Sequence, residues 1–373
     1  MANKKSTGKL PEKISVFLKE KMQEIRRHKG GSSSDYMGLA LQYNRLDLED
    51  HSFSESNMKH YEAGVEVKFG ENSLKGVERL YRTSLVIEPT LICAAHCRYC
   101  LRANYSRFTL DENELTKIAQ YCGSKDLRDQ LKEVLITGGD PLIIPGRLAF
   151  LIDALCRHAP NIKIMRIATR LLTQAPNRID NNVFEIFKNK PQVRFELATQ
   201  INHPVEFFPE TIEVIKHLNA LGVRIYSQNV LLKGVNDDIS ILSDLYDKIR
   251  DNGIEAHYLF HCVPMKGVHH LRTSLEKGLT LIRKLTNSGV VSGRVKPMYA
   301  AMTDIGKVTL YEGVILKKNS NNEVLLQSEY TYKDRMIWNP SWKLPKTAVI
   351  DKKGFLRVWY LDGKDSKLSS GRI

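Results

Sequence analysis

The fold is decided by the stretch Ser84-Leu-Val-Ile-Glu-Pro-Thr90-Leu-Ile-Cys93-Ala-Ala-His-Cys97-Arg-Tyr-Cys100, in which three cysteines fall within eight residues. The apolar run over 84–90 predicts a buried strand, and the cysteines follow its carboxyl end. That end of the strands is where α/β barrels keep their chemistry. Six cysteines in 373 residues do not make a disulfide framework. A cluster of three in a reducing compartment therefore predicts a metal site.

Further strand patterns alternate with amphipathic helical windows on the carboxyl side of this stretch. The predicted strands cover 84–90, 133–137, 162–169, 193–199, 223–232 and 254–260. Apolar residues at i, i+3/i+4 and i+7 predict the helices between them, the first with a capping box of Thr109 and Glu112. Nearly continuous apolar strands with short connections indicate a parallel sheet covered by helices. The predicted fold class is α/β, a partial (β/α)6 TIM-like barrel.

The barrel is expected to cover residues 76–302, between two segments whose sequence patterns differ from its own. Residues 1–75 are predicted to form an N-terminal arm, helical or mobile, in which the glycines and serines of 30–34 act as a linker. Residues 303–373 are predicted to form a small antiparallel β appendage, with strands at 307–316, 323–330 and 348–360. All three tryptophans lie in this appendage, where they either pack on the barrel or form an interface.

The charge distribution and the hydropathy of the chain indicate which partners and which cellular location to expect. The net charge is +14, and it resides mainly in the two tails: residues 1–30 hold nine Lys/Arg and three Glu, and residues 331–373 hold ten Lys/Arg and four Asp. Such tails attract nucleic acid, membranes or acidic partners, or serve as solvated faces, but no arginine-rich aromatic motif supports base recognition. No apolar run reaches 18 residues and no apolar segment follows Met1, so we expect a cytoplasmic protein without a membrane span.

The cysteine spacing allows two metal chemistries. Zinc held by Cys93, Cys97 and Cys100 with His96 as fourth ligand is one of them, although structural zinc normally uses two separated ligand pairs. A 4Fe-4S cluster on the three thiolates is the other, and it would leave one iron without a protein ligand. An iron with an open position can bind and reduce a substrate-like cofactor.

The spacing Cys-x3-Cys-x2-Cys, with the aromatic Tyr99 before the last cysteine, resembles the radical S-adenosylmethionine (SAM) superfamily. From residue 79 to about 316 the chain further resembles a divergent member of the lysine 2,3-aminomutase family. The motifs that carry this resemblance stand in the family's order: Thr137-Gly-Gly-Asp140-Pro141-Leu, Arg166-Ile-Ala-Thr-Arg170, Asn202-His-Pro204, Gln228-Asn-Val-Leu-Leu-Lys-Gly-Val-Asn-Asp237, His270-Leu-Arg-Thr273 and Tyr311-Glu-Gly-Val-Ile315.

The resemblance implies a set of cofactors and a role for each matching residue. A 4Fe-4S cluster on Cys93, Cys97 and Cys100 would cleave SAM with one electron, and the resulting 5′-deoxyadenosyl radical would take hydrogen from a substrate. The resemblance also implies a small-molecule substrate, an electron donor such as flavodoxin or ferredoxin, and leaves a homo-oligomer open. The residues expected at SAM are Tyr99, Gly138, Gly139, Asp140, Gln200 and Gln228.

Each of these assignments has a structural alternative. The Gly138-Gly139-Asp140 segment would also make an ordinary strand-to-helix turn. Gln200 and Gln228 could be satisfied polar core residues, and Gln200 stands where lysine enzymes usually carry His. Arg102 matches the arginine that holds the substrate carboxylate, a natural bidentate contact, although a lone arginine is more often a surface residue.

The sequence departs from the family where the lysine side chain would bind. Lysine enzymes hold the substrate ammonium with two carboxylates, and the matching positions here are Val263 and Met302. Lysine is therefore not the expected substrate, because an unpaired buried ammonium is very costly. The cysteines that bind zinc in the family's C-terminal segment are also missing, since the last cysteine is Cys262.

Lys307 is the candidate for binding pyridoxal phosphate (PLP), after a strand over 295–301 and a turn at Gly306. A competing alignment makes it the first residue of the next strand, where it would be solvated. The sequence supports three hypotheses about the function. They are a PLP-dependent aminomutase for a non-lysine amino acid, a PLP-independent radical SAM enzyme with another hydrogen abstraction, and a non-catalytic metal- or RNA-binding scaffold.

Overall fold

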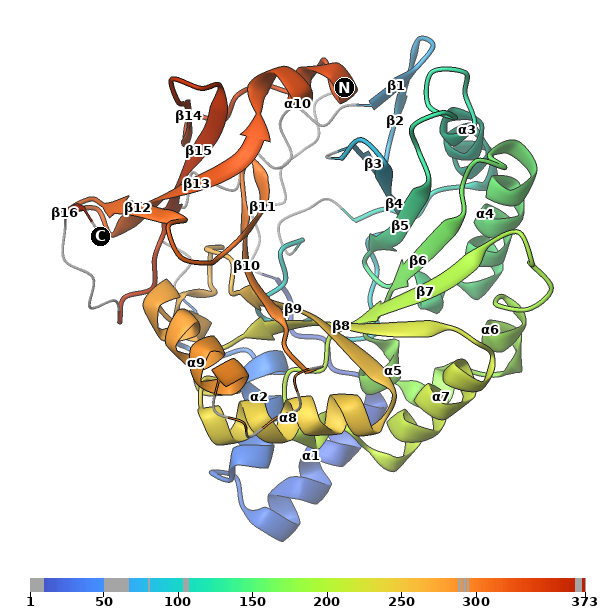
Figure 1. The fold of residues 1–373 in the computed structure, drawn as a ribbon. Coiled ribbons are helices and arrows are strands. Elements are labelled where there is room, and N and C mark those ends of the chain that lie inside the picture. The colour runs from blue at the N-terminus through green and yellow to red at the C-terminus, as the bar shows by residue number, and fades with distance from the viewer. Residues whose placement is uncertain are drawn as a thin grey trace.

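A curled sheet forms the centre of the molecule (Figure 1). The structure is a computed structural model that describes residues 10–49, 67–79, 81–102, 107–287, 289, 291, 293, 295–365 and 371–372. Within these residues the nine strands follow the order β11-β10-β9-β8-β7-β6-β5-β4-β3, and β4 to β10 run parallel. They are β3 (Val77–Glu78), β4 (Ser84–Thr90), β5 (Glu133–Gly138), β6 (Ile164–Ala168), β7 (Arg194–Thr199), β8 (Arg224–Leu231), β9 (Ile254–His261), β10 (Met298–Thr303) and β11 (Gly306–Thr309).

Helices cover the outer face of this sheet in Figure 1, which confirms the predicted partial barrel. The main core lies between the two layers, where strand residues such as Ile136 and Met165 meet helix residues such as Leu151 and Leu155. The helices are α3 (Glu112–Cys122), α4 (Pro145–His158), α5 (Leu171–Gln174), α6 (Asn181–Glu185), α7 (Pro209–Ala220), α8 (Ile239–Asp251) and α9 (Leu275–Asn287). Short 3-10 turns η2 (Pro141–Ile143), η3 (Pro176–Arg178), η4 (Pro204–Glu206) and η5 (His269–Leu271) lie in the connections.

The capping box before α3 differs from the predicted one by two residues. Asp111 accepts a hydrogen bond from the Glu114 amide at 2.8 Å, and Glu114 accepts one from the Asp111 amide at 2.8 Å. Thr109 instead bridges to Thr90, with 2.8 Å between the two hydroxyl oxygens. The prediction was wrong because both spacings satisfy the same motif, and the contact between Thr109 and Thr90 holds residue 109 outside the helix.

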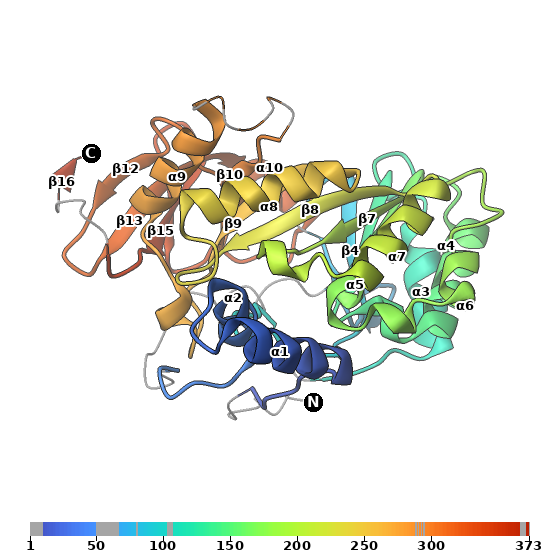
Figure 2. The ribbon, with the colours of Figure 1, turned by 90° about the horizontal axis from the view of Figure 1, so that it is seen from below.

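The N-terminal residues form two helices, α1 (Val16–Lys29) and α2 (Ser34–Tyr43), which pack together beside the barrel (Figure 2). Gly30 ends α1 with φ of 83°, a left-handed conformation that favours glycine, and the Ser33 hydroxyl caps α2. Residues 30–33 therefore form a tight turn between the two helices, at the place where a linker was predicted. A small hairpin of β1 (Val67–Phe69) and β2 (Asn72–Leu74) precedes the barrel.

The C-terminal residues form an antiparallel sheet in the order β14-β15-β13-β12-β16, as the predicted β appendage requires. Its strands are β12 (Ile315–Lys318), β13 (Glu323–Thr331), β14 (Ala348–Ile350), β15 (Phe355–Leu361) and β16 (Gly371–Arg372), with α10 (Tyr332–Trp338) after β13. The strand predicted at 307–316 is split, because β11 pairs with β10 in the barrel sheet.

The appendage packs on the barrel. Trp342 is buried in the same core cluster as the barrel residues. Asp362 accepts a hydrogen bond from the Leu275 amide at 2.8 Å, which places its carboxylate at the N-terminus of α9. None of the helices in the described residues combines the length and the apolar character that spanning a bilayer requires.

Candidate functional site

The cysteine loop leaves β4 beside the end of β5, and two glycines allow this close approach. The Gly139 amide donates to the Thr90 carbonyl at 2.7 Å, and the Asp140 amide donates to the Ile92 carbonyl at 2.8 Å. A Cβ on Gly139 would lie 2.3 Å from the Ile92 oxygen, well inside van der Waals contact. Gly138 has a φ of 103°, which side chains rarely adopt. The predicted glycine motif therefore holds the start of the cysteine loop against the barrel.

The loop places three free cysteines, Cys93, Cys97 and Cys100, close enough for the charge of one thiolate to affect the pKa of another. Burial, Asp140 and the other two sulfurs raise the pKa of the Cys93 thiol well above its usual range. Burial and Cys97 raise the pKa of Cys100 to about 11. Three neighbouring thiolates repel one another, so a bound cationic centre is needed to hold all three deprotonated.

The donor set fits an iron-sulfur cluster better than a single zinc ion. Among the residues that the structure describes, no group of three or more His, Cys, Asp or Glu side chains is arranged to hold one metal ion. His96 is engaged elsewhere, because Nδ1 lies 2.8 Å from the Pro11 carbonyl and Nε2 lies 3.4 Å from Arg107 Nη2. In an iron-sulfur cluster each thiolate binds its own iron, so the sulfurs need not converge on one point.

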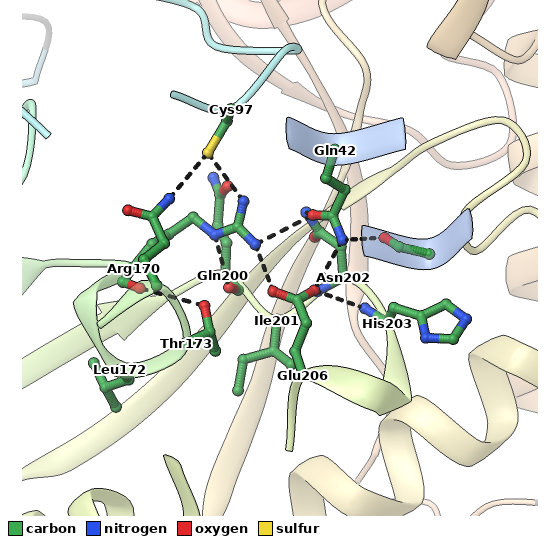
Figure 3. Close-up of polar contacts among 12 residues, drawn as sticks. Gln42, Cys97, Arg170, Leu172, Thr173, Gln200, Ile201, Asn202, His203 and Glu206 are labelled. Atoms are coloured by element: carbon green, nitrogen blue, oxygen red, sulfur yellow. Dashed lines mark hydrogen bonds and ion pairs between the residues drawn. The ribbon is translucent and has the colours of Figure 1, made fainter. Parts of the chain in front are cut away.

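Arg170 and Gln174 surround Cys97, and the sequence analysis gave neither a role. Arg170 Nη1 donates to Cys97 Sγ at 3.0 Å (Figure 3). Gln174 Nε2 donates to the same sulfur at 3.4 Å. Burial opposes the charge of Arg170, but Cys97, Tyr43, Tyr99 and Glu206 together raise its pKa well above the usual value. The motif ending in Arg170 was visible in the sequence, whereas its partner on α2, Gln42, carried no signal.

Tyr99 lies inside the protein, among polar side chains. Its hydroxyl accepts hydrogen bonds from Arg170 and, at 2.6 Å, from Asn202 Nδ2, and it lies 3.3 Å from the Gln42 side-chain oxygen and 3.4 Å from that of Gln200. Gln200 follows β7 and is half-buried. Tyr99 and Gln200 therefore meet beside Cys97, and their contact with SAM stays a prediction.

Asp140 ends the glycine motif with a buried carboxylate. It accepts hydrogen bonds from the Thr169 hydroxyl at 2.8 Å, the Arg170 amide at 2.9 Å and the Leu142 amide at 3.1 Å. Burial raises the pKa of Asp140 to about 6, against the effect of these donors. The carboxylate thus ties the end of β6 to the end of β5, and the amide of the same residue contacts the segment that leads to Cys93. Its predicted contact with the amino group of SAM stays a prediction.

Gln228 lies at a register shift in β8, where the pairing with β9 changes between Ser227 and Gln228. Its side chain is half-buried rather than sealed in the core. A bulge of this kind redirects a side chain on a strand, and such bulges are frequent beside active sites. The predicted contact of Gln228 with SAM stays a prediction.

Arg102 contacts two carboxylates of the chain itself. It forms a hydrogen-bonded ion pair with Glu88 on β4, and Nη2 lies 3.9 Å from Glu78 on β3. Burial raises the pKa of Glu78 to about 7, although Arg102 acts in the opposite direction. The positive charge of the Arg102 guanidinium is therefore largely balanced by these two carboxylates. Its predicted role at a substrate carboxylate stays a prediction, and it would require Arg102 to exchange or share these partners.

Lys307 lies on β11, as the competing alignment proposed, but it is not solvated as that alignment expected. The Nζ atom lies 3.9 Å from the centre of the Tyr258 ring, so the side chain points over β9. Burial and the nearby charge of Arg166 lower the pKa of Lys307 to about 8, while Glu133 opposes the shift. A half-buried lysine with a lowered pKa is the kind that can act as an amine nucleophile.

Val263 and Met302, which replace the two lysine-binding carboxylates, lie beside the cysteine loop. Val263 is buried, and Met302 packs on the same apolar cluster. The cluster also includes Tyr99 and Val230, with Cys97 packed against it. The side of the site expected to receive a substrate side chain is therefore apolar.

Known proteins resemble this chain over most of its length. The family model of the radical SAM superfamily matches residues 87–245. The "Putative L-lysine 2,3-aminomutase" of Aquifex aeolicus is 32% identical over 281 residues, covering 72% of this chain and 74% of that protein. The L-lysine 2,3-aminomutase of Clostridium subterminale is 26% identical, covering 72% and 65%. A solved radical SAM methyltransferase from Sphaerobacter thermophilus is 16% identical, covering 77% and 95%, with a TM-score of 0.45.

Proposed function

The chain belongs to the lysine 2,3-aminomutase family of radical SAM enzymes, and from this membership we propose that it abstracts hydrogen from an amino acid other than lysine and rearranges it. The family's cofactors are a 4Fe-4S cluster and SAM. In the proposed assignment Cys93, Cys97 and Cys100 hold the cluster. When bound there, the cluster would supply the one electron that cleaves a carbon-sulfur bond of SAM into methionine and a 5′-deoxyadenosyl radical, and that radical would take a hydrogen atom from the substrate.

The observation that carries this proposal is the set of three cysteines, for which the described part of the chain offers no fourth protein ligand. The nearby imidazole of His96 is turned to Pro11 and Arg107, so it would leave the fourth iron of a bound cluster free for SAM. Arg170 and Gln174 orient the Cys97 sulfur, and Gly139 holds the start of the loop. The apolar cluster around Val263 would keep water from the reacting centre.

The direct test is SAM cleavage by protein reconstituted with iron and sulfide without oxygen. With dithionite as reductant, we expect a brown protein with four irons per chain on the cysteine loop and formation of 5′-deoxyadenosine. We propose a flavodoxin or ferredoxin as the natural electron donor. A protein that binds iron but never cleaves SAM would instead support the non-catalytic scaffold.

Lysine is expected to be a very poor substrate or none. The lysine ammonium would enter the apolar cluster of Val263 and Met302, where it loses its water shell and gains no carboxylate. We expect no β-lysine from L-lysine when SAM cleavage is active, as measured by chromatography of the amino acids. The double variant V263D/M302D should bind lysine better than the parent. Efficient β-lysine formation by the unaltered chain would contradict this prediction.

If the protein is a PLP-dependent aminomutase, we propose that Lys307 is the residue that would hold PLP. A pKa of about 8 gives half of the lysine as neutral amine at pH 8, where an ordinary lysine is almost wholly charged. After incubation with PLP and borohydride reduction, peptide mapping should find the label on Lys307, with labelling that rises through about pH 8. K307R is the matched control, because it keeps the cation and removes the amine. Intact SAM cleavage without label on Lys307 would favour the PLP-independent enzyme.

A further inference from the structure

The guanidinium of Arg170 has an acceptor for each of its five N–H groups. Nε donates to the Gln200 carbonyl at 3.2 Å. Nη1 donates to Cys97 Sγ at 3.0 Å and to the Tyr99 hydroxyl. Nη2 donates to Glu206 Oε2 at 2.6 Å and to Gln42 Oε1 at 3.2 Å. Because every N–H donor has an acceptor, the guanidinium is fixed in one orientation. In this orientation its Nη1 group points at the sulfur of Cys97 (Figure 3).

The N-terminal helix α2 supplies part of this arrangement. Gln42 is fully buried, its Nε2 donates to Glu206 Oε1 at 3.0 Å, and its Oε1 accepts from Asn202 at 3.1 Å. The Arg98 amide, within the cysteine loop, donates to the Gln42 carbonyl at 2.8 Å. One residue of α2 therefore holds both the loop and the arginine that contacts it.

Glu206 fixes the other side of the guanidinium and balances its charge. The carboxylate is fully buried and also accepts hydrogen bonds from the amides of Asn202 at 2.8 Å and His203 at 3.0 Å. Arg170 is thus a cation held at a sulfur ligand, and its field is partly cancelled by an anion on its far side. Hydrogen bonds to the sulfurs and nearby charge are two of the factors that set the reduction potential of an iron-sulfur cluster.

We propose that Arg170 is a positioning residue that makes the cluster easier to reduce through its contact with Cys97, and that Gln42 and Glu206 hold it in place. This inference rests on the proposed cluster at the three cysteines. Reduction adds one negative charge to a centre that already carries three thiolates. A cation at 3.0 Å from one of those sulfurs stabilises the reduced form more than the oxidised form. Glu206 limits that effect, so the two residues should act in opposite directions.

The experiment is a dye-mediated redox titration of reconstituted protein without SAM, followed by the electron paramagnetic resonance signal of the reduced cluster. Arg170→Met should shift the midpoint potential to more negative values, and Arg170→Lys should shift it less. Glu206→Gln should shift it to less negative values. Arg166→Met is the matched control, because Arg166 makes a similar pair with Glu196 at 2.6 Å on β6 and β7 without contacting a cysteine. It should leave the potential unchanged.

The outcomes separate this inference from the proposed function. If the unaltered protein binds no cluster, the proposed function fails before any variant is compared. If it binds a cluster and Arg170→Met has the parent potential, the inference is wrong and the proposed function stands. If Arg170→Met does not fold, the midpoint potentials of Glu206→Gln and Arg170→Lys provide the test. The inference is wrong if both variants have the same midpoint potential as the parent. A shift in Arg166→Met as large as in Arg170→Met overturns it as well.

Discussion

Replacement of Cys97 by alanine is expected to abolish the formation of 5′-deoxyadenosine from SAM. The variant lacks the thiolate that receives hydrogen bonds from Arg170 and Gln174, and two cysteines cannot hold a cluster that leaves only one iron open. The loss should be complete rather than partial, and cluster content should fall with it. Product chromatography and iron and sulfide analysis of the same anaerobic sample provide the two measurements.

Cys156→Ala is the matched control for this experiment. Cys156 is also a free, half-buried thiol, but it lies on α4, outside the cysteine loop. The control should retain cluster content and SAM cleavage. Parent-level 5′-deoxyadenosine from Cys97→Ala would show that the cluster assignment is wrong. Equal loss in Cys156→Ala would show that removal of any thiol harms the preparation.

Gly139→Ala is expected to have the second large effect, on stability rather than directly on chemistry. The new methyl group would meet the backbone nitrogen of Ile92 at 2.5 Å and its oxygen at 2.3 Å. Backbone atoms cannot swing away as a long side chain can. The segment that leads to Cys93 must therefore shift, and the hydrogen bonds from Gly139 to Thr90 and from Asp140 to Ile92 weaken. Overpacking of this kind costs about 1–3 kcal/mol.

The measurement is denaturant unfolding of protein prepared without iron, so that the result does not depend on SAM or on the cluster. Gly146→Ala is the control, because it lies in the first turn of α4 and a Cβ there meets nothing within 4 Å. That change should be neutral or stabilising by up to about 1 kcal/mol. If Gly139→Ala is as stable as the parent, the glycine is not needed for packing, and a role restricted to SAM binding would become the better explanation.

The order of strands and helices could be predicted from the sequence. The six predicted strands agree with β4 to β9 to within two residues at each end, because strand and helix periodicities are properties of neighbouring residues. The position of the cysteine loop followed from the same local pattern, since the loop begins directly after β4. The family resemblance, which rests on motifs in order along the chain, was confirmed by relatives at 26–32% identity.

The environment of the cysteines was decided only by the tertiary structure. Gln42 and Arg170 are 128 residues apart and meet beside Cys97, and no spacing rule links such positions. Lys307 shows the same limit: its strand was one of two predicted alternatives, but the Tyr258 ring beneath its ammonium comes from β9. Local sequence determined the helices, the strands and the spacing of the three cysteines, because these depend on neighbours in the chain. Packing of distant segments determined which buried charges and hydrogen-bond donors face the cysteines, because a buried polar group takes whichever partner the fold brings within reach.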